Sequence, residues 1–159
     1  MSESYHVRLS KERFVFSAAH FITYGGDVCE PLHGHNYHVT AEVHGPLDEN
    51  HYVVDFIVVR DAVQKIVDSL DHRMLLPLEH PTIQVSVETD EVHVKHGIRR
   101  WVFPREDCVL LPLANTTAEL LARHIANLLI EALPGKAHSR VCVGVDECDG
   151  QLGSCELRP

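Results

Sequence analysis

The sequence lacks any apolar run long enough to cross a membrane, and its first residues contain no apolar stretch like that of a secretory signal peptide. Basic residues are scarce as well: 14 Lys and Arg stand against 23 Asp and Glu, for a formal net charge of −9. Proteins that bind nucleic acid hold its phosphates on basic surfaces. We therefore expect a cytoplasmic protein that has neither nucleic acid nor a membrane among its partners.

Cysteine shows no regular pattern either. The chain has 5 cysteines, an odd number without even spacing, and we expect free thiols in a reducing compartment. The one residue type in surplus is histidine, with 13 copies. Because the 159 residues contain neither an internal repeat nor a linker, we expect a single domain over residues 1–159 with its own core.

Alternation of apolar and polar residues predicts strands in three places. Apolar side chains occupy every second position in residues 13–20, 36–44 and 141–145, so one face of each strand would be buried. Shorter alternating runs between Thr82 and Leu111 predict added strands.

Two helices are predicted from apolar residues at helical spacing. The first covers residues 59–70, and the second follows Thr116 and ends at Pro134. Thr116 and Glu119 have the spacing of a capping box, in which each side chain satisfies a backbone amide of the first turn. The order of elements predicts an α+β fold, with two helices packed on one face of an antiparallel sheet and extra strands inserted between the helices.

Three histidines are predicted to share one face of this sheet. Side chains two apart in an extended segment point the same way, so His33 and His35 lie together, and His20 ends the first strand on its apolar face. Three neutral imidazoles suit Zn²⁺ and leave a fourth coordination position open. A hydrogen-bonded pair of core histidines is the alternative for His33 and His35, but the third histidine favours a metal site.

Two other metal-binding patterns fit poorly. The cupin pattern places a glutamate closer to the second histidine than Glu42 lies to His35. The metallo-β-lactamase pattern places an aspartate immediately before the next histidine, where this chain has Tyr37 before His38.

Six motifs resemble, in the same order, the 6-pyruvoyltetrahydropterin synthase / 6-carboxytetrahydropterin synthase family. They are Phe16-Ser17-Ala18-Ala19-His20, Cys29-x-x-x-His33-Gly34-His35-Asn36-Tyr37, Val53-Val54-Asp55-Phe56, Leu70-Asp71-His72, Asn115-Thr116-Thr117-Ala118-Glu119 and Glu147. The resemblance implies the tunnelling fold, and a homo-oligomer (hexamer or tetramer) with active sites between subunits. Residues 75–113 are longer than the family's connection, so we interpret them as an inserted or extended segment.

The resemblance also implies a metal centre and a set of catalytic residues. His20, His33 and His35 would hold zinc, and Cys29 would be the base. Asp71 and His72 would form a proton relay, in which the carboxylate fixes the tautomer of the imidazole. The alternative for His72 is a solvated histidine that the helix dipole favours.

Glu147 would accept paired hydrogen bonds from the amino-pyrimidine edge of a pterin. Asp146 takes its place if the register of the strand shifts. Thr116 and Thr117 are further candidates for pterin contacts, with helix capping as the alternative for both.

The spacing from Cys29 to His33 resembles enzymes that convert 7,8-dihydroneopterin triphosphate to 6-carboxy-5,6,7,8-tetrahydropterin in the deazaguanine (queuosine) pathway. Glu30 resembles the glutamate of another branch, which forms 6-hydroxymethyl-dihydropterin for folate; a surface carboxylate without a role is the alternative. Formation of 6-pyruvoyltetrahydropterin, a different zinc hydrolase and a non-catalytic zinc-binding protein also stay open. Candidate cations for the triphosphate are Arg13, Lys65, Lys95, Arg99, Arg100 and Arg105.

Overall fold

Two long antiparallel strands form the centre of the main sheet in the computed structural model, which describes residues 2–135 and 138–159. β1 (Tyr5–His20) pairs with β4 (His33–Gly45), and the register shifts only between Ser10 and Val15. β10 (Arg140–Asp146) pairs with β4, and β11 (Leu152–Leu157) pairs with β10, both antiparallel. The strands predicted from alternation are confirmed, although β1 and β4 are longer than predicted.

Two short strands extend this sheet beyond β1, and their parallel pairing was not predicted. β5 (Arg73–Pro77) pairs with β1, and β9 (Cys108–Leu111) pairs with β5, giving the order β11-β10-β4-β1-β5-β9. Both strands are short and lie in continuous apolar runs, which alternation does not reveal. The sheet is therefore antiparallel in four strands and parallel at one edge.

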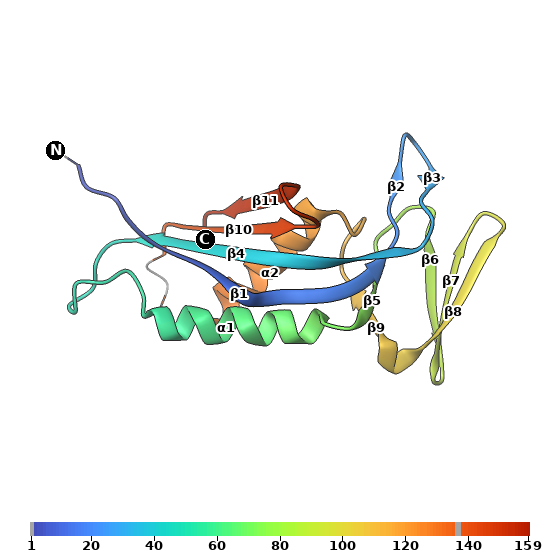
Figure 1. Cartoon of the computed structure of the whole chain (residues 1–159), viewed down its shortest axis with the longest axis horizontal. Helices are drawn as coiled ribbons and strands as arrows, with labels where there is room; N and C mark the ends of the chain where they lie inside the picture. Colours follow the sequence, from blue (N-terminus) through green and yellow to red (C-terminus); the bar gives the residue numbers. More distant parts are fainter. Residues whose placement is uncertain (1, 136–137) are drawn as a thin grey trace.

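Both helices cover the same face of the main sheet, as predicted (Figure 1). α1 (Phe56–Leu70) begins after Asp55, whose carboxylate accepts a hydrogen bond from the amide of Ile57 at 2.7 Å. α2 (Ala118–Ala132) begins after Thr117, whose hydroxyl accepts from the amide of Leu120 at 3.4 Å. The predicted capping box of Thr116 and Glu119 is wrong, because the helix begins one residue later and Thr116 is fully buried.

The main core lies between the helices and the inward face of the sheet. The inward side chains of β4 are buried as predicted: Tyr37, Val39, Ala41 and Val43. They pack against the apolar stripes of the two helices, among them Val59 and Val63 of α1 and Leu121, Ile125 and Leu129 of α2. His44, which follows Val43 in β4 and belongs to the other face of the alternation, is nevertheless only 6% exposed because its ring stacks on that of His6 at 4.6 Å.

The segment between the helices contains a second sheet. β6 (Gln84–Glu88), β7 (Glu91–His96) and β8 (Arg99–Pro104) form an antiparallel meander, followed by a short 3-10 helix (Arg105–Asp107). A small hairpin of β2 (Thr23–Tyr24) and β3 (Val28–Cys29) lies beside it (Figure 1). The added strands predicted between Thr82 and Leu111 are thus confirmed, and they have a small core of their own around Phe21 and Val92.

The helices found within residues 2–135 and 138–159 are all too short or too polar to cross a membrane.

Candidate functional site

The structure brings His20, His33 and His35 together at one end of the main sheet. His20 ends β1 directly opposite His33 at the start of β4, and His35 follows on the same face. The ligating nitrogens of the three rings all lie within 4.8 Å of one another. Ring centroids are 4.7 Å apart for His20 and His33, and 4.8 Å apart for His33 and His35. The alternation predicted this arrangement correctly.

Backbone carbonyls orient two of the rings. Nδ1 of His20 donates to the carbonyl of Thr116 at 2.9 Å, and Nδ1 of His33 donates to the carbonyl of Pro31 at 2.9 Å. These bonds leave Nε2 of each ring free to bind a metal, the arrangement typical of metal-binding histidines. Nε2 of His20 is buried and has no hydrogen-bond partner among the described residues. Because an unpaired buried nitrogen is costly, a metal ion fits this cluster.

Burial also keeps His20 in the form that binds metals. Desolvation, opposed by the hydrogen bond to Thr116 and aided by the nearby His33 and His35, lowers the pKa of His20 from its ordinary value of 6.5 to about 4. The imidazole is therefore neutral near pH 7, as a metal ligand must be.

The burial of His20 predicts that the metal-free protein loses stability in mild acid. Since its folded pKa is depressed to about 4, the unfolded chain binds a proton that the folded chain excludes. The free energy of unfolding should fall by about 3 kcal/mol from this group as the pH drops from about 6.5 to about 4. Urea unfolding of chelator-treated protein at a series of pH values measures how the free energy of unfolding changes with pH.

The matched control for that measurement is His124, whose pKa is also lowered by burial. His20→Gln should remove the contribution of His20 to the pH dependence of the free energy of unfolding, whereas His124→Gln should leave that contribution unchanged. An identical pH dependence in wild type and His20→Gln would contradict the assignment.

Glu30, rather than Cys29, points its side chain toward the histidines. A carboxylate oxygen of Glu30 lies 3.9 Å from Nε2 of His33. The thiol of Cys29 is half-buried and packs against the small second core. Burial raises the pKa of this thiol, while the positive charge of Arg99 opposes the rise. Two candidate bases thus stand side by side in different environments.

Glu147 directly follows β10 and lies close to the histidine cluster. Desolvation raises the pKa of its carboxyl group, and the nearby His35 opposes that rise. Asp146 lies within β10 and accepts a hydrogen bond from the amide of Gln151, so the register shift that would have replaced Glu147 by Asp146 does not occur.

Tyr37 belongs to the same site, although its sequence pattern indicated only a core residue. Its ring stacks on Phe16 at 4.7 Å, and its buried hydroxyl has no hydrogen-bond partner among the described residues. Burial raises the pKa of this hydroxyl, with smaller contributions from the negative charges of Glu147 and Glu30. The only signal in the sequence was its position two residues after His35, on the same face.

Thr116 and Thr117 contribute to the site by orienting His20 and by capping α2. Thr116 is buried, its hydroxyl donates to the carbonyl of Phe21 at 3.4 Å, and its own carbonyl orients His20. Thr117 caps α2. Sequence analysis missed the carbonyl of Thr116 because backbone groups leave no residue signature.

Asp71 and His72 are held together at the end of α1. Ser17 donates its amide to the Asp71 carboxylate at 2.7 Å, and the amide of His72 donates to the Ser17 carbonyl at 2.7 Å. Nδ1 of His72 donates to the other carboxylate oxygen at 2.8 Å. The Ser17 amide, followed by His72, lowers the pKa of Asp71, so this carboxylate stays charged and holds the imidazole in one tautomer.

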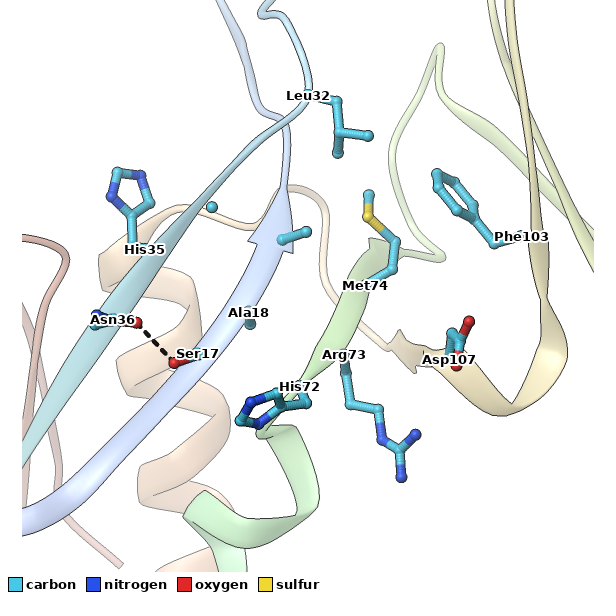
Figure 2. A pocket seen from close by; sticks show the side chains of 12 residues that line it. Ser17, Ala18, Leu32, His35, Asn36, His72, Arg73, Met74, Phe103 and Asp107 are labelled. Atoms are coloured by element: carbon cyan, nitrogen blue, oxygen red, sulfur yellow. Dashed lines mark hydrogen bonds between the residues drawn. The ribbon is translucent and has the colours of Figure 1, made fainter.

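This pair lies on the other side of β1 and β4 from the metal candidates. His72 is exposed (82%) beside an open hollow of about 690 Å³, which Ser17, His35 and Asn36 also line. Figure 2 shows the ring of His35 across β4 from His72. One chain therefore does not bring the Asp71–His72 pair to the face on which the three histidines converge.

A second group of possible ligands, Glu42, His44 and Cys142, lies further along β4 and β10. Two guanidinium groups already occupy it. Nε of Arg8 lies 3.4 Å from the Glu42 carboxylate, and an Arg140 nitrogen lies 3.0 Å from both ring nitrogens of His44. A metal ion would have to displace these cations, so His20, His33 and His35 form the better centre.

Comparisons with known proteins identify the family of the chain. Residues 8–156 match the family model described as 6-pyruvoyl tetrahydropterin synthase. A Methanocaldococcus jannaschii protein, provisionally named 6-carboxy-5,6,7,8-tetrahydropterin synthase, is 33% identical over 144 residues, covering 88% of this chain and 87% of that protein.

Two solved structures confirm the fold. The Plasmodium falciparum 6-pyruvoyl tetrahydropterin synthase superposes with a TM-score of 0.91 at 29% identity, covering 99% of this chain and 100% of that one. A Plasmodium vivax 6-pyruvoyltetrahydropterin synthase, in which a catalytic glutamate is replaced by alanine, has a TM-score of 0.90 at 27% identity and the same coverage. The α+β tunnelling fold predicted from the sequence is therefore confirmed.

Proposed function

Because the chain belongs to the 6-pyruvoyl tetrahydropterin synthase family, we propose that it is a zinc-dependent lyase. It acts on the side chain of 7,8-dihydroneopterin triphosphate and forms 6-carboxy-5,6,7,8-tetrahydropterin. The observation that carries the proposal is the cluster of His20, His33 and His35, in which backbone carbonyls leave Nε2 of His20 and of His33 free. The names of the relatives support the substrate class.

Zinc in this cluster would act as a Lewis acid toward the hydroxyl groups of the side chain and so make the neighbouring carbon-bound proton easier to remove. Side chains of the chain itself remove the proton and bind the pterin. Cys29 accepts the proton as the base, with Glu30 as the second candidate. Glu147 binds the amino-pyrimidine edge of the pterin, because a carboxylate matches its paired donors. Thr116 and Thr117 shape the wall of the pterin site through the start of α2.

The Asp71–His72 pair enters the reaction as a proton relay from a second subunit. In one chain it lies across the sheet from the metal candidates, so a complete site requires another copy. This supports a homo-oligomer (a hexamer or a tetramer) with active sites between subunits, which is also what the family resemblance implies. The five cysteines, none of which forms a disulfide within the described residues, support a cytoplasmic location.

A second product, 6-hydroxymethyl-dihydropterin, is favoured by a specific contact. The Glu30 carboxylate lies 3.9 Å from Nε2 of His33, which places it beside the metal candidates. A structurally similar Plasmodium vivax protein also has a catalytic glutamate. If Glu30 works as the base, cleavage of the side chain would leave the hydroxymethyl group on the ring.

Incubation with 7,8-dihydroneopterin triphosphate, with products separated by chromatography, tests both proposals. Zinc-loaded wild type should release acetaldehyde and triphosphate and form the carboxylated pterin. Loss of the general base should lower the rate by about 10²–10⁴-fold. Cys29→Ala should therefore lose the carboxylated product, and Glu30→Ala should lose the hydroxymethyl product if both residues work.

Three other outcomes would overturn the proposal. Metal-dependent hydrolysis of other substrates that survives Cys29→Ala would indicate a different zinc hydrolase. Pterin binding without turnover would indicate a non-catalytic zinc-binding protein. If neither substrate loss nor pterin binding appears, the activity of the family does not apply to this chain.

A further inference from the structure

The hairpin that carries Cys29 is too small to hold its own conformation. β2 and β3 pair at two positions, and hairpins of this size are marginally stable in water without other support. The hairpin lies between His20 and His33, so its conformation decides where Cys29 and Glu30 stand relative to the histidine cluster. Its support must come from elsewhere in the fold.

Arg99 of β8 provides one part of that support. Its Nη1 donates to the carbonyl of Cys29 at 2.9 Å and to the carbonyl of Glu30 at 3.0 Å. Hydrogen bonds from a charged donor are stronger than those between neutral groups, and two consecutive carbonyls on one nitrogen fix the peptide between the two candidate bases.

The guanidinium of Arg99 is itself held in place. It lies over the ring of Trp101, 5.0 Å from the centroid, as in a cation–π contact. Trp101 stacks in turn on Phe21 with centroids 4.6 Å apart. Phe21 is almost fully buried and directly follows His20. A continuous stack therefore connects the carbonyls of the hairpin to the strand that carries the first histidine.

The tip of the hairpin is attached to the same segment of the chain. Asp27 accepts hydrogen bonds from the hydroxyl of Thr82 at 2.6 Å and from Nε2 of His96 at 2.8 Å. Nδ1 of His80 accepts backbone amides of its own turn at 2.9 and 3.1 Å, so its Nε2 carries the proton and donates to the hydroxyl of Thr23 at 2.7 Å. Each of these donors belongs to the segment that contains the second sheet.

We propose that the second sheet, β6–β8, is a support for the Cys29–Glu30 segment, and that Arg99 is the positioning residue that fixes the backbone of this segment next to the histidine cluster. The proposal rests on the proposed function for the roles of Cys29 and Glu30. In this role Arg99 acts through the backbone carbonyls of the segment rather than by binding the triphosphate of the substrate.

Arg99→Ala tests the proposal in zinc-loaded protein, with Arg123→Ala as the charge-matched control because Arg123 lies on the exposed side of α2. Hydrogen exchange of the amides in residues 23–30 should quicken at least about tenfold in Arg99→Ala and stay unchanged in Arg123→Ala, while bound zinc stays the same. Misplacement of the base should lower kcat by about 10–100-fold with little change in KM.

Inorganic tripolyphosphate distinguishes this role from phosphate binding. If Arg99 only positions the hairpin, the inhibition constant of tripolyphosphate is equal in wild type and Arg99→Ala. A weaker inhibition together with a raised KM would overturn the proposal, and so would unchanged exchange in residues 23–30. The exchange measurement needs no turnover, so it separates a failure of this proposal from a failure of the proposed function.

A second variant covers the case in which Arg99→Ala does not fold. Thr82→Val removes one hydrogen bond to Asp27 and leaves the stack of Arg99 and Trp101 intact. Exchange in residues 23–30 should quicken by a smaller factor, while β6–β8 stay protected. If exchange of the hairpin stays as slow as in wild type, the second sheet is not its support.

Discussion

Replacing His33 by alanine is expected to leave a folded protein that binds no zinc and turns over the pterin at least about 10³-fold more slowly. His33 is partly exposed at the start of β4, so its loss removes little from the core. It does remove one of three converging nitrogens and the contact of that ring with the Glu30 carboxylate. Elemental analysis of bound metal and steady-state rates measure the two effects.

The matched control is His38→Ala. His38 belongs to the same strand but is exposed on the opposite face, where it takes no part in the cluster. Zinc content and rate should both stay at the wild-type level in this variant. Full zinc content in His33→Ala would show that the ion binds elsewhere and would reject the three-histidine centre.

The convergence of the three histidines could be predicted because a strand has a strict period of two. Once His33 and His35 lie on the inward face of one strand and His20 on that of the next, antiparallel pairing brings the three rings together. What orients them could not be predicted in the same way. The carbonyls of Thr116 and Pro31 that hold the rings of His20 and His33 are backbone groups, which any residue supplies.

The environment of Cys29 could not be predicted from the sequence, for a different reason. The second sheet was expected as a set of added strands, but its contacts with the hairpin join residues about 70 positions apart, such as Arg99 and Cys29. Local patterns contain no information about such pairs. The sequence therefore groups Arg99 with the candidate cations for the triphosphate, whereas the structure pairs its guanidinium with two carbonyls.

The parallel edge of the sheet could not be predicted from local patterns either, and it determines the position of the Asp71–His72 pair. Pairing of β5 with β1 follows directly after His72, and it fixes the Asp71–His72 pair against Ser17. Hydrogen bonds join the two residues to Ser17 and to each other, but the pair lies on the side of the sheet away from the histidine cluster. As the proposed relay, this pair would therefore act from a neighbouring subunit.

This leads to the expected result of mixing two inactive variants. His33→Ala removes the metal centre, and His72→Asn removes the relay while keeping a residue that tolerates the left-handed backbone found there (φ 55°). Each variant alone should be nearly inactive. After both are unfolded together and refolded in equal amounts, about a quarter of the wild-type activity should return, because sites between subunits draw one intact part from each chain.

The reciprocal mixture makes the result decisive. Wild type refolded with the double variant His33→Ala/His72→Asn should also give about a quarter of full activity if sites are shared between subunits, but about half if each chain has a complete site. Size-exclusion chromatography of the refolded mixtures, with the two chains carrying different tags, verifies that mixed oligomers form. No recovery in the first mixture together with half activity in the second would place the relay and the metal centre in the same chain.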